Sequence, residues 1–162
     1  MINPTEITED LANKKLNVTR TFNAPIDQVW KAWTDDTLLD KWWAPRPWKA
    51  ETKSMNFTEG GTWLYSMVGP EGERHWSRVD FTTITPTESF EATSRFCNED
   101  GTPDSNMPTI HWVNVFKPFD AGTLYEATLS FDKAIDMETL VKMGFKGGFT
   151  MGLGNLDELL AK

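Results

Sequence analysis

Residues 144–162 read GFKGGFTMGLGNLDELLAK, and their pattern constrains the architecture of the chain more tightly than any other segment. Large apolar residues recur three or four positions apart, which is the period of an α-helix with one buried face. They are Phe145, Phe149, Leu153, Leu156 and Leu160. A second stripe beside them consists of glycines alone: Gly144, Gly148 and Gly152. Because each glycine inside a helix costs roughly 1 kcal/mol relative to alanine, we predict that another element lies very close to this helix, or that a space remains beside it.

The preceding segment, from Trp48 to about Lys133, has the residue pattern of a β-sheet. Short runs rich in Thr, Val, Phe, Trp and Tyr favour strands, and residues typical of turns separate them. The turns lie at residues 59–61, 69–72, 85–87, 98–104 and 120–122. Six strands joined by connections of hairpin length predict a mostly antiparallel meander.

The N-terminal residues 1–15 are mostly polar, and we expect them to form an arm or a short surface helix ahead of a single domain at residues 16–162. The domain begins with a strand around residues 16–22, where Leu16 and Val18 alternate with polar residues. This strand ends before Pro25, because proline lacks the N–H that a strand ladder needs.

Two helices follow this first strand. Pro25 suits the first turn of a helix. Four apolar residues then share one helical face: Ile26, Val29, Trp30 and Trp33. Asp35 can cap a second, short helix that carries Trp42 and Trp43 on one side and ends before Pro45. The predicted order is therefore strand, two helices, six strands and one long helix.

The net charge of −8 and the absence of any cluster of Lys and Arg argue against a nucleic-acid partner. No apolar run approaches the roughly 20 residues needed to cross a bilayer, so we expect no membrane association. Cys97 is the single cysteine, which excludes an internal disulfide and fits the reducing cytoplasm. We find no phosphate loop and no dinucleotide fingerprint, and we expect no cofactor.

Several segments resemble the successive signatures of one family. They are FNAPIDQVWKAWTD, LLDKWWAP, FTEGGTW with MVGPEGE, FTTITPTESF, and the closing GGFTMGLGNLDELLAK. In this order they resemble the START-like (SRPBCC) superfamily, in the branch of the activator of heat-shock-protein-90 ATPase homologues. The resemblance covers residues 16–162. It implies an α+β helix-grip fold of the order β-α-α-β6-α, in which a curved antiparallel sheet wraps around a long C-terminal helix and leaves a ligand cavity.

The alternation of side chains along strands indicates which residues line such a cavity. Trp63, Tyr65 and Met67 share one face of a strand, and we expect this face to point inward. Of Trp42 and Trp43, we expect one to be buried in the core and the other to face the cavity mouth. The predicted ligand-binding residues are Trp43, Trp63, Tyr65, Met67, Arg78, His111, Glu126, Gly144, Gly148 and Met151.

Residues that could carry chemistry are few. His75 and His111 are the only histidines, and they lack the spacing of metal ligands on one element. Either could act as a general base if a carboxylate oriented it, with His111 the better candidate because it falls in mid-strand. The acidic neighbours of Cys97 raise the pKa expected for its thiol, so we interpret it as unreactive. We assign no catalytic residue.

The charged residues within the predicted strands point to solvent or into the cavity depending on register, and a shift of one residue reverses every assignment. They are Arg78, Asp80, Arg95 and Glu126. An inward arginine would need a buried partner, such as Asp80 or Glu126, or an anionic group of the ligand.

The preferred interpretation is a module that binds a small hydrophobic or aromatic molecule, either alone or as a homodimer. The alternative is an enzyme similar to polyketide cyclases of the same superfamily, with His111 and Arg78 transferring protons in the cavity. A third interpretation is a chaperone-associated stress-response module, although the named activators have an additional chaperone-binding domain for which this chain has no room.

Overall fold

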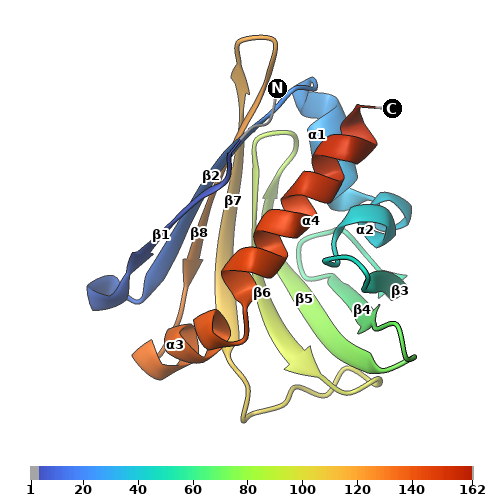
Figure 1. The fold of residues 1–162 in the computed structure, drawn as a ribbon, viewed down its shortest axis with the longest axis vertical. Coiled ribbons are helices and arrows are strands. Elements are labelled where there is room, and N and C mark those ends of the chain that lie inside the picture. Colours follow the sequence, from blue (N-terminus) through green and yellow to red (C-terminus); the bar gives the residue numbers. More distant parts are fainter. Residues whose placement is uncertain (1–3, 162) are drawn as a thin grey trace.

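A computed structural model describes residues 4–161, which form one curved antiparallel sheet with helices on its concave side (Figure 1). The spatial order of the strands is β1-β2-β8-β7-β6-β5-β4-β3. Their bounds are β1 (Glu6–Asp10), β2 (Lys15–Phe22), β3 (Lys49–Met55), β4 (Thr62–Val68), β5 (Arg74–Thr85), β6 (Ser89–Cys97), β7 (Thr109–Phe119) and β8 (Gly122–Ser130). The helices are α1 (Ile26–Thr34), α2 (Asp36–Trp42), α3 (Ala134–Lys142) and α4 (Phe145–Leu160), with a short 3-10 turn at Leu11–Asn13.

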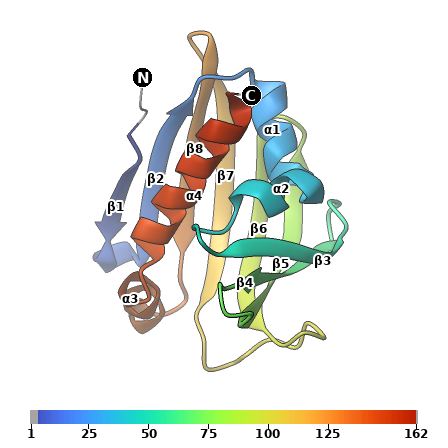
Figure 2. The ribbon, with the colours of Figure 1, turned by 45° about the vertical axis from the view of Figure 1, so that its right-hand side comes forward.

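The α+β fold predicted from the sequence, a curved antiparallel sheet with a long C-terminal helix, is confirmed. Figure 2 shows α4 crossing the concave face of the sheet, with α1 and α2 beside its C-terminal half. Within residues 4–161, no helix is both long enough and apolar enough to span a membrane.

The first correction concerns the N-terminal segment, for which the sequence predicts an arm or a short surface helix. Its described part instead adds an edge strand, β1, which pairs antiparallel with β2. The Asp10 side chain accepts a hydrogen bond from the Asn13 backbone N–H, and Lys14 takes a left-handed conformation, so the chain reverses tightly between the two strands. Edge pairing uses backbone groups and little apolar surface, which is why the sequence pattern does not reveal it.

The second correction concerns the region beyond Asp136, for which the sequence predicts a single long helix, whereas the structure has two, α3 and α4. Gly144 lies between them with φ of +91°, a left-handed conformation that glycine adopts without the strain of a side chain. The break separates a short helix near the end of β8 from the longer helix that crosses the sheet (Figure 1).

Helix α4 lies close to the end of α2, and the glycine stripe explains how. A Cβ atom added at Gly152 would lie 3.1 Å from the Trp43 carbonyl oxygen and 3.5 Å from that of Trp42. The Asn155 amide donates hydrogen bonds to the Ala44 and Trp42 carbonyl oxygens, at 3.1 and 3.4 Å. These carbonyl groups at the end of α2 would otherwise be buried without partners.

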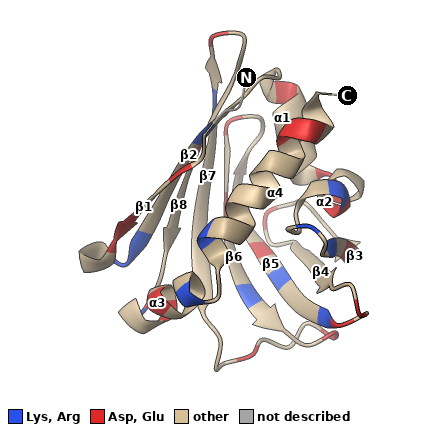
Figure 3. Ribbon diagram, viewed as in Figure 1, with Lys and Arg blue, Asp and Glu red and all other residues tan. Residues whose placement is uncertain are grey.

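On its other side, α4 is held to β2 by an ion pair. The Arg20 guanidinium, nearly buried, bonds the Asp157 carboxylate. Figure 3 shows charged residues only near the two ends of α4, and its middle carries none. The C-terminal half of the helix is thus fixed on both flanks, while its N-terminal half passes over the strands at the centre of the sheet.

Candidate ligand-binding cavity

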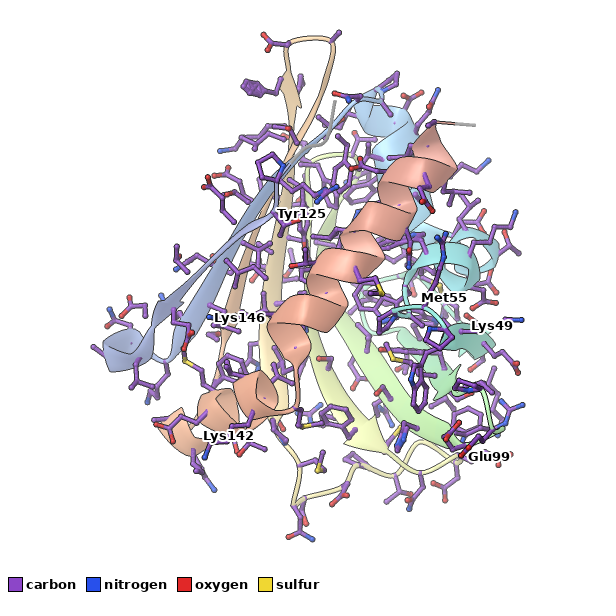
Figure 4. All side chains as sticks on the ribbon, in the orientation of Figure 1. Lys49, Met55, Glu99, Tyr125, Lys142 and Lys146 are labelled. Atoms are coloured by element: carbon purple, nitrogen blue, oxygen red, sulfur yellow. The ribbon has the colours of Figure 1, made fainter. Side chains whose placement is uncertain are left out.

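A cavity of about 260 Å³ lies between the N-terminal half of α4 and the concave face of the sheet. Strands β4, β5, β6 and β7 form its floor, and α1, α2, α3 and α4 supply the remaining wall. The wall is mostly apolar and contains four tryptophans, which are Trp33, Trp43, Trp63 and Trp112. Tyr125, labelled in Figure 4, is fully buried and stacks on the Trp33 ring, with 4.6 Å between the ring centroids.

Strand alternation places every second side chain of the floor in the cavity. The residues of β4 that face it are Trp63, Tyr65 and Met67; those of β5 are His75, Ser77, Val79 and Phe81; those of β6 include Ala92, Ser94 and Phe96. The expectation that Trp63, Tyr65 and Met67 point inward agrees with this geometry.

Trp43 and Tyr65 are joined at the centre of the wall. The Trp43 indole Nε1 donates a hydrogen bond to the Tyr65 hydroxyl, at 2.9 Å. Trp63 stacks on the Tyr65 ring, with 4.1 Å between the ring centroids. Burial raises the pKa of Tyr65 to about 12, so its phenol keeps the proton at neutral pH.

Of the two neighbouring tryptophans at the end of α2, Trp42 is the core residue. Only 1% of its surface is exposed, and its Nε1 donates to the Ala32 carbonyl oxygen at 2.9 Å. Trp43 instead lies in the cavity wall. Asn155 and Gly152 of α4 hold the backbone at this point, so the same contacts that seat α4 also fix the position of the Trp43 ring.

The exposed members of the wall mark the cavity mouth. They are His75, Met143 and Gly144. Trp48 packs against the His75 imidazole, with 5.4 Å between the ring centroids. The mouth therefore lies between the α3–α4 junction and the β4–β5 turn, which lie toward the same end of the molecule in Figures 1 and 2.

Six of the ten predicted ligand-binding residues lie in the cavity wall: Trp43, Trp63, Tyr65, Met67, Gly144 and Gly148. The other four do not. Strand alternation is the reason for three of them, because their sequence neighbours take the inward positions. The fourth, Met151, is 47% exposed on the outer face of α4.

The three strand residues lie on the convex face and have partners there. Arg78 bonds Asp80, with 2.7 Å between Nη2 and Oδ1. The His111 imidazole lies between the Thr93 hydroxyl and the Asp132 carboxylate, at 3.2 and 3.1 Å. Glu126 pairs with Lys117 at 2.8 Å. A carboxylate does orient His111, as a general base would require, but on the face opposite the cavity.

Several polar residues of the wall were not predicted from the sequence, namely Ser77, Ser94 and Asn114. His75 and Arg95, which also line the cavity, were considered without being assigned to it. The signal for Ser77 and His75 was present, because Val79 and Phe81 continue the same alternation along β5. Asn114 and Ser94 could not be distinguished from exposed polar residues without the pairing of β6 with β7. Among residues 4–161, no group of three or more His, Cys, Asp or Glu side chains is arranged to hold a metal ion.

Residues 23–161 match the family model described as activator of Hsp90 ATPase homolog 1-like protein. The chain belongs to this family. Two solved structures support the assignment to the activator of Hsp90 ATPase homolog 1-like family across nearly the whole chain. Protein Ms6760 from Mycobacterium smegmatis is 27% identical, with 97% of each chain covered and a TM-score of 0.90. A protein from Arthrobacter aurescens is 26% identical, with 96% of this chain and 91% of that chain covered and a TM-score of 0.91.

A third structure in the comparison, protein NE0264 from Nitrosomonas europaea, is 27% identical over 93% of this chain and 96% of that chain, with a TM-score of 0.80. The chain has no significant match among curated proteins. The resemblance to the activator of Hsp90 ATPase homologues is therefore confirmed, and this family is of a ligand-binding type.

Proposed function

We propose that this protein binds one small hydrophobic or aromatic molecule in the cavity beneath α4. The observation that carries the proposal is the cavity itself, a space of about 260 Å³ bordered by aromatic rings and open at one end. Protein interiors are close-packed, and a space of this size that the chain leaves unfilled is typical of a binding site. Because a single cysteine fits a reducing compartment, we propose that binding takes place in the cytoplasm.

The alternative of a cyclase-like reaction used His111 and Arg78 as proton-transferring groups inside the cavity. Both side chains lie on the convex face, held by Asp132 and Asp80.

The proposal is tested by native mass spectrometry of protein purified from its own cells. We expect a non-covalent adduct in the mass range of a small organic molecule, which denaturation releases. The released compound, added back at about 100 times its dissociation constant, should raise the free energy of unfolding by about 2.7 kcal/mol.

A matched pair of variants locates the binding site. Gly148 lies in the cavity wall, and its added Cβ would contact only the Pro45 ring, at 3.7 Å. Gly148→Leu should therefore fill the space and abolish the adduct. Gly147 is exposed on the same helix, and a Cβ there meets nothing within 4 Å, so Gly147→Leu is the control that should retain the adduct. Loss of the adduct in both variants, or in neither, would contradict the assigned site.

A further inference from the structure

The hydrogen bonds within the cavity wall follow one pattern. In three places, a residue of the wall or the core donates a hydrogen bond to an oxygen atom that lines the cavity. These pairs are Trp43 Nε1 with Tyr65 Oη at 2.9 Å, Trp112 Nε1 with Ser94 Oγ at 2.9 Å, and Tyr125 Oη with Asn114 Oδ1 at 2.6 Å. Each bond uses a lone pair of the accepting group and leaves that group's own hydrogens unused.

The unused hydrogens are the polar groups that the cavity can offer to a guest. A hydroxyl that accepts a hydrogen bond still carries its proton, and an asparagine amide whose oxygen is occupied keeps two N–H donors. Among residues 4–161, the Ser94 hydroxyl and the Asn114 Nδ2 have no acceptor within hydrogen-bonding distance. Asn114 is buried and Ser94 half-buried, and a donor left unpaired away from water is costly.

Tyr65 adds a third donor. Ser77 is its register partner on β5 and faces the cavity beside it. Whichever of these two hydroxyls donates to the other, one of their two protons remains for a guest. Burial keeps the Tyr65 phenol protonated, because the pKa is raised to about 12. The donors therefore come from the floor of the cavity on β4, β6 and β7.

Anionic groups are missing from the described part of the wall, and its cationic member is Arg95. None of the described residues that line the cavity is an aspartate or a glutamate. A guest with an ammonium group would lose its hydration and find no anionic partner, which makes its burial unfavourable.

From these observations, and resting on the proposed function, we infer that the cavity selects a flat aromatic molecule that carries a carbonyl oxygen and no positive charge. The oxygen accepts a hydrogen bond from Tyr65, Ser94 or Asn114. The ring system lies among Trp43, Trp63 and Trp112, whose faces and edges suit aromatic contacts. The volume of about 260 Å³ limits the guest to a small ring system.

Three probes with the same arrangement of non-hydrogen atoms test this inference by isothermal titration calorimetry. They are acetylnaphthalene, isopropylnaphthalene and naphthylethylamine, substituted at the same ring position. They place an oxygen, a methyl group and an ammonium group at one point. We expect the ketone to bind about 10-fold more tightly than the hydrocarbon, as one net hydrogen bond predicts, and the amine to show no measurable binding.

The outcomes separate this inference from the proposed function. If the hydrocarbon binds as tightly as the ketone, the selection for a carbonyl oxygen is wrong while binding in the cavity stands. Tightest binding of the amine also overturns the inference. If none of the three probes binds, the inference is overturned, and the proposed function is then decided separately by the adduct that co-purifies with the protein.

Variants of the donors identify which group makes the bond. Tyr65→Phe, Ser94→Ala and Asn114→Leu each remove one donor, and at least one of them should reduce the ratio of ketone to hydrocarbon affinity to about 1. Both probes are measured on the same variant, so a general loosening of the fold cancels in the ratio. Thr93→Val is the control, because the Thr93 hydroxyl bonds His111 on the convex face. An unchanged ratio in all three donor variants would overturn the inference.

Discussion

Asp80 is the centre of a charged cluster on the convex face of the sheet. Its carboxylate accepts hydrogen bonds from the Thr62 hydroxyl and the Arg78 guanidinium, both at 2.7 Å, and lies 3.4 Å from Arg95. The Arg78 Nη1 also donates to the Gly101 carbonyl oxygen at 2.9 Å, which ties the loop after β6 to the sheet. Asp80 therefore organises both strand pairing and the position of this loop.

Replacement of Asp80 by asparagine should give a pH-dependent loss of stability. Desolvation raises the pKa of Asp80, but hydrogen bonds from Arg78 and Thr62 and the nearby positive charges outweigh it and lower the pKa below its usual value. A lowered folded-state pKa stabilises the protein above the unfolded-state pKa, and this stabilisation is lost as the pH falls through the folded-state value. We expect Asp80→Asn to cost about 1–2 kcal/mol near neutral pH, and the difference to shrink below about pH 4.

Urea denaturation of both proteins at a series of pH values measures this difference. Thr62→Val, which removes one hydrogen bond and no charge, should give a smaller loss than Asp80→Asn. A difference between wild type and Asp80→Asn that stays constant from neutral to acid pH would contradict the charge-based explanation.

Two glycines of α4 should respond in opposite directions to substitution by alanine. At Gly154 an added Cβ meets nothing within 4 Å, so Gly154→Ala should raise the free energy of unfolding by up to about 1 kcal/mol through helix propensity. At Gly152 the Cβ would press on the Trp43 carbonyl oxygen at 3.1 Å, and Gly152→Ala should cost about 1–2 kcal/mol. Thermal and urea unfolding check the signs. Equal effects would mean that α4 can shift away from α2.

At the scale of residues, strand alternation predicted that Trp63 and Tyr65 face the cavity, and it did not predict on which face of the sheet the charged residues lie. Trp63 and Tyr65 follow from alternation in a strand with a strongly apolar face. Arg78 and Glu126 were uncertain because alternation gives two faces but not which one is concave. The Arg78–Asp80 pair considered from the sequence does form, on the opposite face of the sheet.

At the scale of elements, α4 is attached to β2 through a single nearly buried ion pair. The Arg20 side chain is 5% exposed and the Asp157 side chain 28%. We expect Asp157→Ala to lower the free energy of unfolding by about 3 kcal/mol, because it leaves a buried guanidinium without its anionic partner. Chemical denaturation measures the loss.

The adjacent acidic residue supplies the control for this prediction. Glu158 pairs with Arg46, and both side chains are about 60% exposed. Glu158→Ala should therefore change stability by less than about 1 kcal/mol. Similar losses in the two variants would show that burial of the Arg20 pair does not matter.

The sequence predicted the elements that carry strong periodicity or turn chemistry. These are the first strand, both helices after it, the six strands and the final helix. It missed β1, whose pairing depends on backbone hydrogen bonds of an edge strand, and the boundary between α3 and α4. That boundary depends on a left-handed φ at Gly144, and the sequence shows several glycines there without indicating which one breaks the helix.

At the scale of the whole molecule, the cavity should lower the free energy of unfolding of the protein without ligand while it permits binding. Ala92 on β6 lines the cavity, so Ala92→Val adds volume where space is available and suits a strand. We expect the free energy of unfolding without ligand to rise by about 0.5–1 kcal/mol, because cavity filling stabilises, and the affinity for naphthalene ketones to fall.

A second buried alanine on the same sheet serves as the control. Ala127 on β8 is 4% exposed and lies outside the cavity wall, in the packed core. Ala127→Val should be destabilising by about 1–3 kcal/mol, because a packed core must distort to admit the extra methyl groups. If urea unfolding showed that both substitutions stabilise the protein, the stabilisation at Ala92 could not be attributed to the cavity.

The global arrangement was the most predictable level, because the glycine stripe, the six strands and the family resemblance all indicate a helix lying across a curved sheet. The location of the cavity mouth was not predictable. It depends on how α3, the loop after α2 and the β4–β5 turn meet, and these segments are distant in sequence.

The tryptophans that border the cavity give the protein an optical property. Of the eight tryptophans in the chain, Trp33, Trp43, Trp63 and Trp112 line the cavity, and the Trp43 ring lies within 6.2 Å, centroid to centroid, of Trp33, Trp63 and Trp112. Rings this close exchange excitation energy. A carbonyl compound bound among them should therefore quench the fluorescence of all four tryptophans, while the more distant tryptophans continue to emit. Occupancy could then be followed by intrinsic fluorescence in unlabelled protein.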